Sequence, residues 1–258
     1  MSEVPTLRVV PLEHIRRHEE IDPMRVERLM GRIAADGVQV NPMVCSEAPG
    51  GELVLLDGAT RTAALKGLGL EHAVVQIVEP THFELETWHH VVRDCPVERL
   101  LQRIRTEERI SLTAVSGPPL VHLVDDSRFS VVSDKISANA ALAALVKTYI
   151  GSWTVSRVTD PSTDSVAWRF PDWSMIVEFP TLTAQDVLTA AVEEDLLPAG
   201  ITRFIVDGRA LRLNVDLSML EASVTQEEKQ ASLERILEDR AHDGRIRRYE
   251  ETVFILDD

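Results

Sequence analysis

The 258-residue sequence contains only two cysteines, Cys45 and Cys95, and they form no Cys-x-x-Cys pair. Two cysteines in a chain of this length do not support a disulfide framework, so we expect buried, reduced thiols and a cytoplasmic protein. No apolar run approaches the length of a membrane span, and the first residues lack the basic and apolar regions of a signal peptide. The sequence therefore predicts no membrane partner.

Positive charge is also scarce, because 27 Lys and Arg residues face 42 Asp and Glu residues, for a formal net charge of −15. Both parts of the chain share this excess: residues 1–80 hold 8 basic and 12 acidic side chains, and the remainder holds 19 and 30. Binding to a phosphate backbone needs a basic footprint, so DNA is disfavoured as a partner, although a local basic patch would escape this count.

The hydrophobic content of 44% is that of an ordinary soluble protein, and its pattern divides the chain into two parts. Residues 1–105 are predicted to form a compact domain in the order β-α-β-β-α-β. Asp22-Pro23 begins its first helix and Gly37 ends that helix. The predicted strands are Leu7–Val10, Met43–Cys45, Leu53–Leu56 and Ala73–Val78, and the second helix is Thr60–Leu68.

Residues 106–258 are predicted to form a second α+β domain. Four helices are expected after residue 80, over Glu84–Val92, Val97–Arg109, Asn139–Ile150 and Ala184–Glu194, and a fifth follows a Thr225-x-x-Glu228 capping box. Strands are expected over Leu120–Val124, Phe129–Val132, Met175–Phe179 and Thr252–Leu256, with a hairpin of Ile201–Val206 and Ala210–Val215 around Asp207-Gly208. Thr159–Ser165 reads as a loop.

The stretch Leu53–Gly69 carries the clearest chemical signal. A buried strand runs through Asp57-Gly58 into a helix N-terminus, an arrangement that points several backbone N–H groups at one spot and favours a phosphate there. Asp57, Thr60 and Arg61 add a carboxylate, a hydroxyl and a guanidinium. The alternative is a buried strand with an Asp cap on the next helix, and the local pattern gives the two readings equal weight.

Other polar groups are ambiguous when each is taken alone. Glu19 and Glu20 lie just before a helix and would either complement its dipole or supply a general base. Thr202-Arg203 is either a solvated strand end or an anion-binding corner. Trp88 is typical of a helix core. His89 and His90 are adjacent and would not share a helix face, so a two-His metal site is not expected.

Taken together, these segments resemble the free L-serine kinases of the ParB/sulfiredoxin-like superfamily, most closely the SbnI-type proteins of staphyloferrin B siderophore loci. The similarity runs along most of the chain. It rests on His18-Glu19, on the Leu-Leu-Asp-Gly-Ala-Thr-Arg turn, on Thr87-Trp88 and on the stretch from Pro198 to Phe204.

The resemblance implies phosphorylation of free L-serine to O-phospho-L-serine by ATP or ADP with Mg²⁺, for a siderophore or 2,3-diaminopropionate-type pathway. It implies catalytic roles for Glu19 and Asp57 (Asp57 also as Mg²⁺ ligand), phosphate binding by Gly58, Ala59, Thr60 and Arg61, and an amino-acid pocket lined by Trp88, Thr202 and Arg203. A free amino acid needs its carboxylate clamped, which suits Thr202 and Arg203.

One position departs from the family, whose turn usually reads Asp-Gly-x-His-Arg, because Thr60 replaces the histidine. A hydroxyl donates to a phosphate but does not act as a cation or carry a proton near neutral pH. This departure leaves a catalytically inactive binding module open as an alternative. The resemblance itself leaves another, a ParB-like DNA-binding regulator with or without kinase activity, because SbnI-type proteins are associated with DNA binding as well as kinase activity. Sulfiredoxin chemistry is disfavoured because the turn has no cysteine, and Cys45 lies on a preceding strand.

Overall fold

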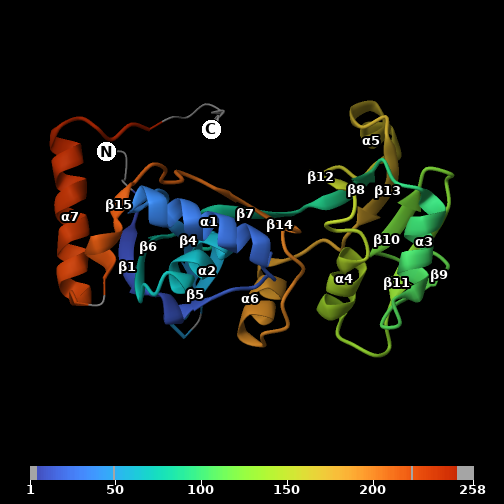
Figure 1. Cartoon of the computed structure of the whole chain (residues 1–258), viewed down its shortest axis with the longest axis horizontal. Coiled ribbons are helices and arrows are strands. Elements are labelled where there is room, and N and C mark those ends of the chain that lie inside the picture. Colours follow the sequence, from blue (N-terminus) through green and yellow to red (C-terminus); the bar gives the residue numbers. More distant parts are fainter. Residues whose placement is uncertain (1–4, 49, 222, 249–258) are drawn as a thin grey trace.

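The computed structural model describes residues 5–48, 50–221 and 223–248, and it has the mixed α+β architecture predicted from the sequence (Figure 1). Two β-sheets lie along the long axis of the molecule, with helices against them. None of the helices in this described part combines the length and apolar character that crossing a membrane requires. The strand predicted over Thr252–Leu256 lies outside the described residues.

The first sheet has five strands in the order β1-β6-β4-β5-β2, and four of them were predicted. Its strands are β1 (Leu7–Pro11), β2 (Ile15–Arg16), β4 (Met43–Glu47), β5 (Leu53–Asp57) and β6 (His72–Ile77), with a short 3-10 turn, η1 (Leu12–His14), before β2. Helices α1 (Pro23–Asp36) and α2 (Ala59–Gly67) share one apolar cluster with this sheet. This cluster fixes both helices, and through them the residues at their N-termini.

The ends of α1 follow the predicted signals. The Asp22 carboxylate accepts a hydrogen bond from Met24 N at 2.9 Å, and Pro23 occupies the first helical position. Gly37 ends the helix at a φ of 67°, a left-handed conformation that glycine adopts without steric cost.

The chain returns to the first sheet at its C-terminal end. After β15 (Val215–Asp216), which pairs with β3 (Val38–Gln39), and η2 (Leu217–Leu220), helix α7 (Gln226–His242) packs beside β1. The predicted Thr225–Glu228 capping box is present. Gln230 Oε1 accepts from Val9 N at 2.9 Å and Gln226 Nε2 donates to Val9 O at 3.1 Å, so α7 satisfies backbone groups of an edge strand.

The second sheet is antiparallel and has six strands in the order β12-β8-β13-β10-β11-β9. They are β8 (His89–Arg93), β9 (Ser111–Thr113), β10 (Leu120–Leu123), β11 (Arg128–Val132), β12 (Thr154–Val158) and β13 (Trp173–Glu178). Helices α3 (Val97–Thr106), α4 (Ala138–Lys147) and α6 (Ala184–Val192) contribute to its main core, and α5 (Thr163–Arg169) to a smaller cluster. Strand β12 was not predicted, and α5 begins inside the predicted loop Thr159–Ser165.

The helix predicted over Glu84–Val92 is wrong. The segment forms β7 (Phe83–Thr87) and β8 with Trp88 between them, and β7 pairs with β14 (Thr202–Val206) in a ribbon between the two sheets (Figure 1). The apolar and β-branched residues here suit an extended backbone, and strands distant in sequence supply its hydrogen-bond partners. Extended structure also places the adjacent rings of His89 and His90 on opposite faces of β8.

The hairpin predicted over Ile201–Val215 is also wrong, since only its first strand and the turn at Asp207-Gly208 form. Residues 208–214 instead run along the first sheet. There Gln76 Nε2 donates to Gly208 O, and Gln76 Oε1 accepts from Ala210 N at 2.8 Å. Arg212 and Asn214 have φ values of 55° and 47°, which interrupt any strand.

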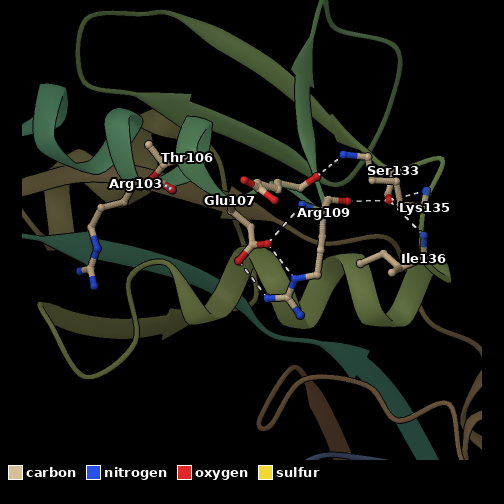
Figure 2. A network of polar contacts seen from close by, with 8 residues as sticks. Arg103, Thr106, Glu107, Arg109, Ser133, Lys135 and Ile136 are labelled. Carbon is tan, nitrogen blue, oxygen red and sulfur yellow. Dashed lines mark hydrogen bonds and ion pairs between the residues drawn. The ribbon is translucent and has the colours of Figure 1, made fainter.

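A polar network joins the end of α3 to the loop that precedes α4 (Figure 2). Arg109 makes a bidentate contact with Glu107, whose pKa this guanidinium lowers to about 2. The Ser133 hydroxyl donates to Arg109 O at 2.6 Å and accepts from Lys135 N at 3.1 Å. These polar contacts hold the segment that leads into α4 in place.

The predicted division into residues 1–105 and 106–258 stays a prediction. The chain enters the second sheet at β8, before residue 105, and comes back to the first sheet in β15 and α7. The strands of the first sheet all lie within residues 7–77 and those of the second within residues 89–178, and the β7–β14 ribbon between the two sheets borders the site described next.

Candidate active site

One cavity of about 680 Å³ lies where the first sheet, α1 and the β7–β14 ribbon meet. All nine site residues named from the sequence line it, although they come from four separate segments of the chain: Glu19, Asp57, Gly58, Ala59, Thr60, Arg61, Trp88, Thr202 and Arg203. The cavity has two ends with different chemistry. We call the turn Asp57–Arg61 with Arg209 the phosphate end, and Glu19, Gly200 and Thr202 with Arg157 the base end, after the phosphate-binding and general-base roles that the sequence predicts for Asp57–Arg61 and for Glu19.

The phosphate end is a tight strand-to-helix turn. The buried strand β5 ends at Asp57, and Gly58 turns the chain at a φ of 106°. A Cβ at Gly58 would lie 2.8 Å from Met43 Cγ and 3.0 Å from Arg61 Nη1, so both the backbone and the available space require glycine. No side chain caps α2, and the first N–H groups of a helix have no partner within it. The turn thus presents the positive end of a helix to the cavity.

Charged groups reinforce this end. Arg209 Nη1 lies 3.1 Å from Asp57 Oδ2, and Arg61 Nη1 donates to Pro42 O at 2.8 Å. Burial lowers the pKa of Arg61, the Asp57 carboxylate raises it, and the nearby Arg209 lowers it. Two guanidiniums held close to one carboxylate leave positive potential for an anion.

At the base end, the backbone around Glu19 pairs with Leu197. Leu197 N donates to His18 O at 2.9 Å, and Glu20 N donates to Leu197 O at 2.8 Å. The Glu19 carboxylate then accepts from Gly200 N at 2.8 Å and contacts Thr202 Oγ1 at 3.4 Å, both through Oε2. Glu20 also lines the cavity, but its carboxylate pairs with Lys147 at 2.8 Å.

The buried His18 supports the base end from behind. Its Nδ1 lies 2.7 Å from Leu55 O, a group that only accepts, so Nδ1 carries the proton and the ring is assigned the Nδ1–H tautomer. Burial lowers the pKa of His18 more than Glu19 raises it, which keeps the ring neutral at pH 7. Nε2 therefore accepts from the Thr202 hydroxyl at 3.0 Å.

Trp88 and Arg203 form a side wall on the β7–β14 ribbon. Trp88 N donates to Ile201 O at 2.8 Å. The Arg203 guanidinium carbon lies 4.8 Å from the centre of the Trp88 ring, and Arg203 Nη1 is 2.6 Å from Glu86 Oε2. Trp88 is thus half-buried beside the cavity rather than part of a helix core.

Five arginines of the cavity were not found from the sequence. Three of them, Arg25, Arg28 and Arg32, are exposed along one face of α1, and their spacing of three and four residues was a detectable signal. Arg157 on β12 and Arg209 after β14 gave no local signal, because distant parts of the chain bring them to the cavity. Seven arginines against four carboxylates line the cavity of a chain whose net charge is −15.

The carboxylates of the cavity suit a metal that arrives with phosphates rather than a preformed metal centre. Within the described residues, no group of three or more His, Cys, Asp or Glu side chains is placed to hold a metal ion. Mg²⁺ bound to a nucleotide typically takes one or two carboxylates, with the phosphates and water as its other ligands. Asp57, at the phosphate turn, fits that requirement.

Cys45 offers no nucleophile to the cavity. It is buried in β4, and burial raises the pKa of its thiol to about 12, so the thiolate form is not populated near neutral pH.

Comparisons with known proteins agree with the resemblance inferred from the sequence. No protein-family model matches the chain. The ATP-dependent L-serine kinase SbnI of Staphylococcus aureus is 25% identical over 220 residues, which cover 83% of this chain and 84% of SbnI. The predicted similarity to SbnI-type L-serine kinases is confirmed along most of the chain.

Solved structures show the same fold. The structure of C-terminally truncated SbnI from Staphylococcus aureus has a TM-score of 0.76 at 23% identity, covering 91% of this chain and 97% of that one. A free serine kinase in complex with AMP has a TM-score of 0.72 at 14% identity, covering 84% and 95%.

Proposed function

We propose that this protein is an ATP-dependent kinase that phosphorylates free L-serine to O-phospho-L-serine. The observation that carries the proposal is the gathering of all nine expected site residues around one cavity. The predicted phosphate turn shares this space with Glu19, which forms no ion pair with a Lys or Arg of the described residues. Similarity to the L-serine kinase SbnI over 83% of the chain supports the choice of substrate and phosphate donor.

We assign the nucleotide phosphates to the phosphate end. The N–H groups of Gly58, Ala59, Thr60 and Arg61, together with the Thr60 hydroxyl, donate to phosphate oxygens, and Arg61 and Arg209 offset their charge. Asp57 is the ligand that the chain offers to Mg²⁺, which would neutralise charge on the phosphates when it is bound.

We assign the serine hydroxyl to the base end. Glu19 accepts one neutral donor, the Gly200 N–H, on Oε2, which leaves Oε1 for a substrate hydroxyl. Glu19 takes the hydroxyl proton while the serine oxygen forms a bond to the γ-phosphorus. The bond from that phosphorus to the β–γ bridging oxygen breaks, and its electron pair leaves with ADP.

Both halves of the chain contribute to the proposed site. Residues 1–105 supply Glu19, Asp57, the phosphate turn and Trp88, while residues 106–258 supply Gly200, Thr202, Arg203 and Arg209. We propose that the second half acts as the serine-binding part. Closure of such a site would exclude water, which would otherwise accept the phosphoryl group.

The test is direct product detection. The protein is incubated with L-serine, Mg²⁺ and either ATP or ADP, and phosphoserine is measured by mass spectrometry, with a reaction lacking serine as the control for ATP hydrolysis. We expect phosphoserine from L-serine that disappears in Glu19→Gln. A folded protein that binds ATP yet makes no phosphoserine from either nucleotide would overturn the proposal.

The resemblance to siderophore-locus proteins extends the proposal to the pathway, in which phosphoserine would feed a siderophore or 2,3-diaminopropionate-type product. Deleting the gene should then lower intracellular phosphoserine and the siderophore together, and added phosphoserine should restore the siderophore.

A further inference from the structure

The amino-acid substrate has a carboxylate that needs a cationic partner, but Arg203 is already paired with a carboxylate of the protein. Arg203 Nη1 lies 2.6 Å from Glu86 Oε2 on the neighbouring strand, and its guanidinium stacks on Trp88. An arginine that is paired and stacked in this way has a fixed orientation, and it shares its charge with Glu86.

Arg157 is different. It projects from β12, an edge strand of the second sheet, and lines the cavity. Among the described residues, no carboxylate forms an ion pair with its guanidinium. In a protein with 42 acidic side chains, an arginine that lines a cavity and has no carboxylate partner among the described residues is available to a ligand.

Because Gly200 has no side chain, the Arg157 guanidinium has room to lie beside the peptide that contacts Glu19. A Cβ at Gly200 would overlap the Arg157 guanidinium, and the φ of 75° is itself one that favours glycine. The same glycine donates its N–H to Glu19 Oε2 at 2.8 Å. Arg157 therefore lies against the peptide that orients Glu19, yet it does not pair with Glu19.

The charges around Arg157 also favour the binding of an anion there. The loss of surrounding water lowers the pKa of Arg157, Arg25 lowers it further, and Glu19 raises it. Two arginines that repel each other near a single carboxylate are stabilised when an anion enters between them.

We propose that Arg157 binds the carboxylate of the amino-acid substrate, and that Gly200 makes the space that allows it. This inference rests on the proposed kinase function. It assigns the ionic contact of the substrate to an arginine of the second sheet, with Thr202 and Arg203 as the neighbouring wall. L-serine is short, so a carboxylate held at Arg157 keeps the hydroxyl close to Glu19.

The experiment compares substrates with and without a carboxylate. Steady-state kinetics are measured for wild type and Arg157→Gln with L-serine, with L-serinamide and with varied ATP. Arg28→Gln, which removes another arginine from the same cavity, is the matched control. Arg157→Gln should raise KM for L-serine about 10- to 100-fold, the loss expected for a charged hydrogen-bonded contact. KM for L-serinamide and for ATP should stay within about twofold of wild type.

A second variant, Gly200→Ala, should reproduce the selective loss by displacing the guanidinium, and Arg157→Lys should recover part of the serine affinity. The wild-type protein provides a test that does not depend on the folding of any variant. Its KM for L-serinamide should exceed its KM for L-serine by a similar factor.

Equal use of both substrates by wild type would overturn the inference while leaving the kinase function intact. A rise in KM for ATP in Arg157→Gln, with KM for L-serine unchanged, would overturn it too, because Arg157 would then serve the phosphates. A wild-type protein that makes no phosphoserine would overturn the proposed function, and this inference with it.

Discussion

The two ends of the cavity hold their carboxylates in opposite ways. At the phosphate end, Asp57 lies 3.1 Å from the Arg209 guanidinium, so its charge is matched by a permanent cation. At the base end, Glu19 accepts from a backbone N–H and contacts a hydroxyl, and among the described residues no Lys or Arg forms an ion pair with it.

This difference separates two tasks within one space. A carboxylate locked to a guanidinium suits a site of fixed charge, where phosphates and a metal are to be positioned. A carboxylate that accepts only a neutral backbone N–H keeps an oxygen free to take a proton from a hydroxyl. Arg157, the cation of the base end, is close enough to Glu19 to be affected by its charge but does not form an ion pair with it.

The largest effect is expected from removing the Glu19 carboxylate, the one at the base end. Glu19→Gln keeps the shape and removes the proton acceptor, so we expect kcat to fall about 1,000-fold with KM for ATP little changed. Rates of phosphoserine formation measure this. Glu20→Gln is the control, because Glu20 pairs with Lys147 and should cost less than about threefold. Equal losses in the two variants would contradict the assignment.

Removing the Asp57 carboxylate, which is paired with Arg209, should lower activity less. Asp57→Asn should lower kcat/KM for ATP about 100-fold, because one preorganised charge is lost from the phosphate end. The Mg²⁺ concentration that gives half-maximal rate should rise with it. Asp22→Asn changes another carboxylate that lines the cavity and should be nearly silent, since asparagine caps a helix about as well as aspartate. A silent Asp57→Asn would show that this end does not handle the nucleotide.

A reciprocal pair of variants tests whether the ends act separately. Arg209→Gln should raise KM for ATP about tenfold and leave KM for L-serine unchanged. Thr202→Val should do the reverse, because each loses about one polar contact at its own end. Both are read from a two-substrate kinetic grid. If either variant weakened both substrates equally, the division of the cavity into two ends would fail.

The smallest expected effect concerns the pH dependence of stability. Because burial lowers the pKa of His18, the unfolded chain binds more protons than the folded one between that lowered pKa and about 6.5. The free energy of unfolding should therefore fall as the pH falls through this window. One such group contributes a slope of at most about 1.4 kcal/mol per pH unit.

Urea unfolding of wild type and His18→Gln at several pH values measures this slope, which should be shallower in the variant. His14→Gln is the control, because the His14 side chain is 65% exposed. An unchanged slope in His18→Gln would mean that His18 is not held neutral behind the base end.

Local signals predicted the parts of this fold that local chemistry controls. Asp22-Pro23 and Gly37 mark the ends of α1, and Thr225 with Glu228 forms the capping box of α7, because these residues satisfy backbone groups of their own helices. The phosphate turn was predictable for the same reason. It is one continuous strand, glycine and helix.

The errors fall where distant segments compete for the backbone. Glu84–Val92 read as a helix but forms β7 and β8, since β14, β12 and β13 supply its partners from residues more than 60 positions away. The second strand of the hairpin expected around Asp207-Gly208 is replaced by contacts with Gln76 on β6 and with Asn41 between β3 and β4. These contacts place Arg209 beside Asp57.

The sequence by itself determined the α+β class, the helix ends, the phosphate turn and, through its resemblance to L-serine kinases, the nine residues that meet in one cavity. Only the tertiary structure decided that Glu19 and Thr202, which are 183 positions apart, share a contact. It also brought Arg157 against Gly200 and paired Arg203 with Glu86. These outcomes depend on packing between segments remote in sequence, and no local pattern encodes the distance between them.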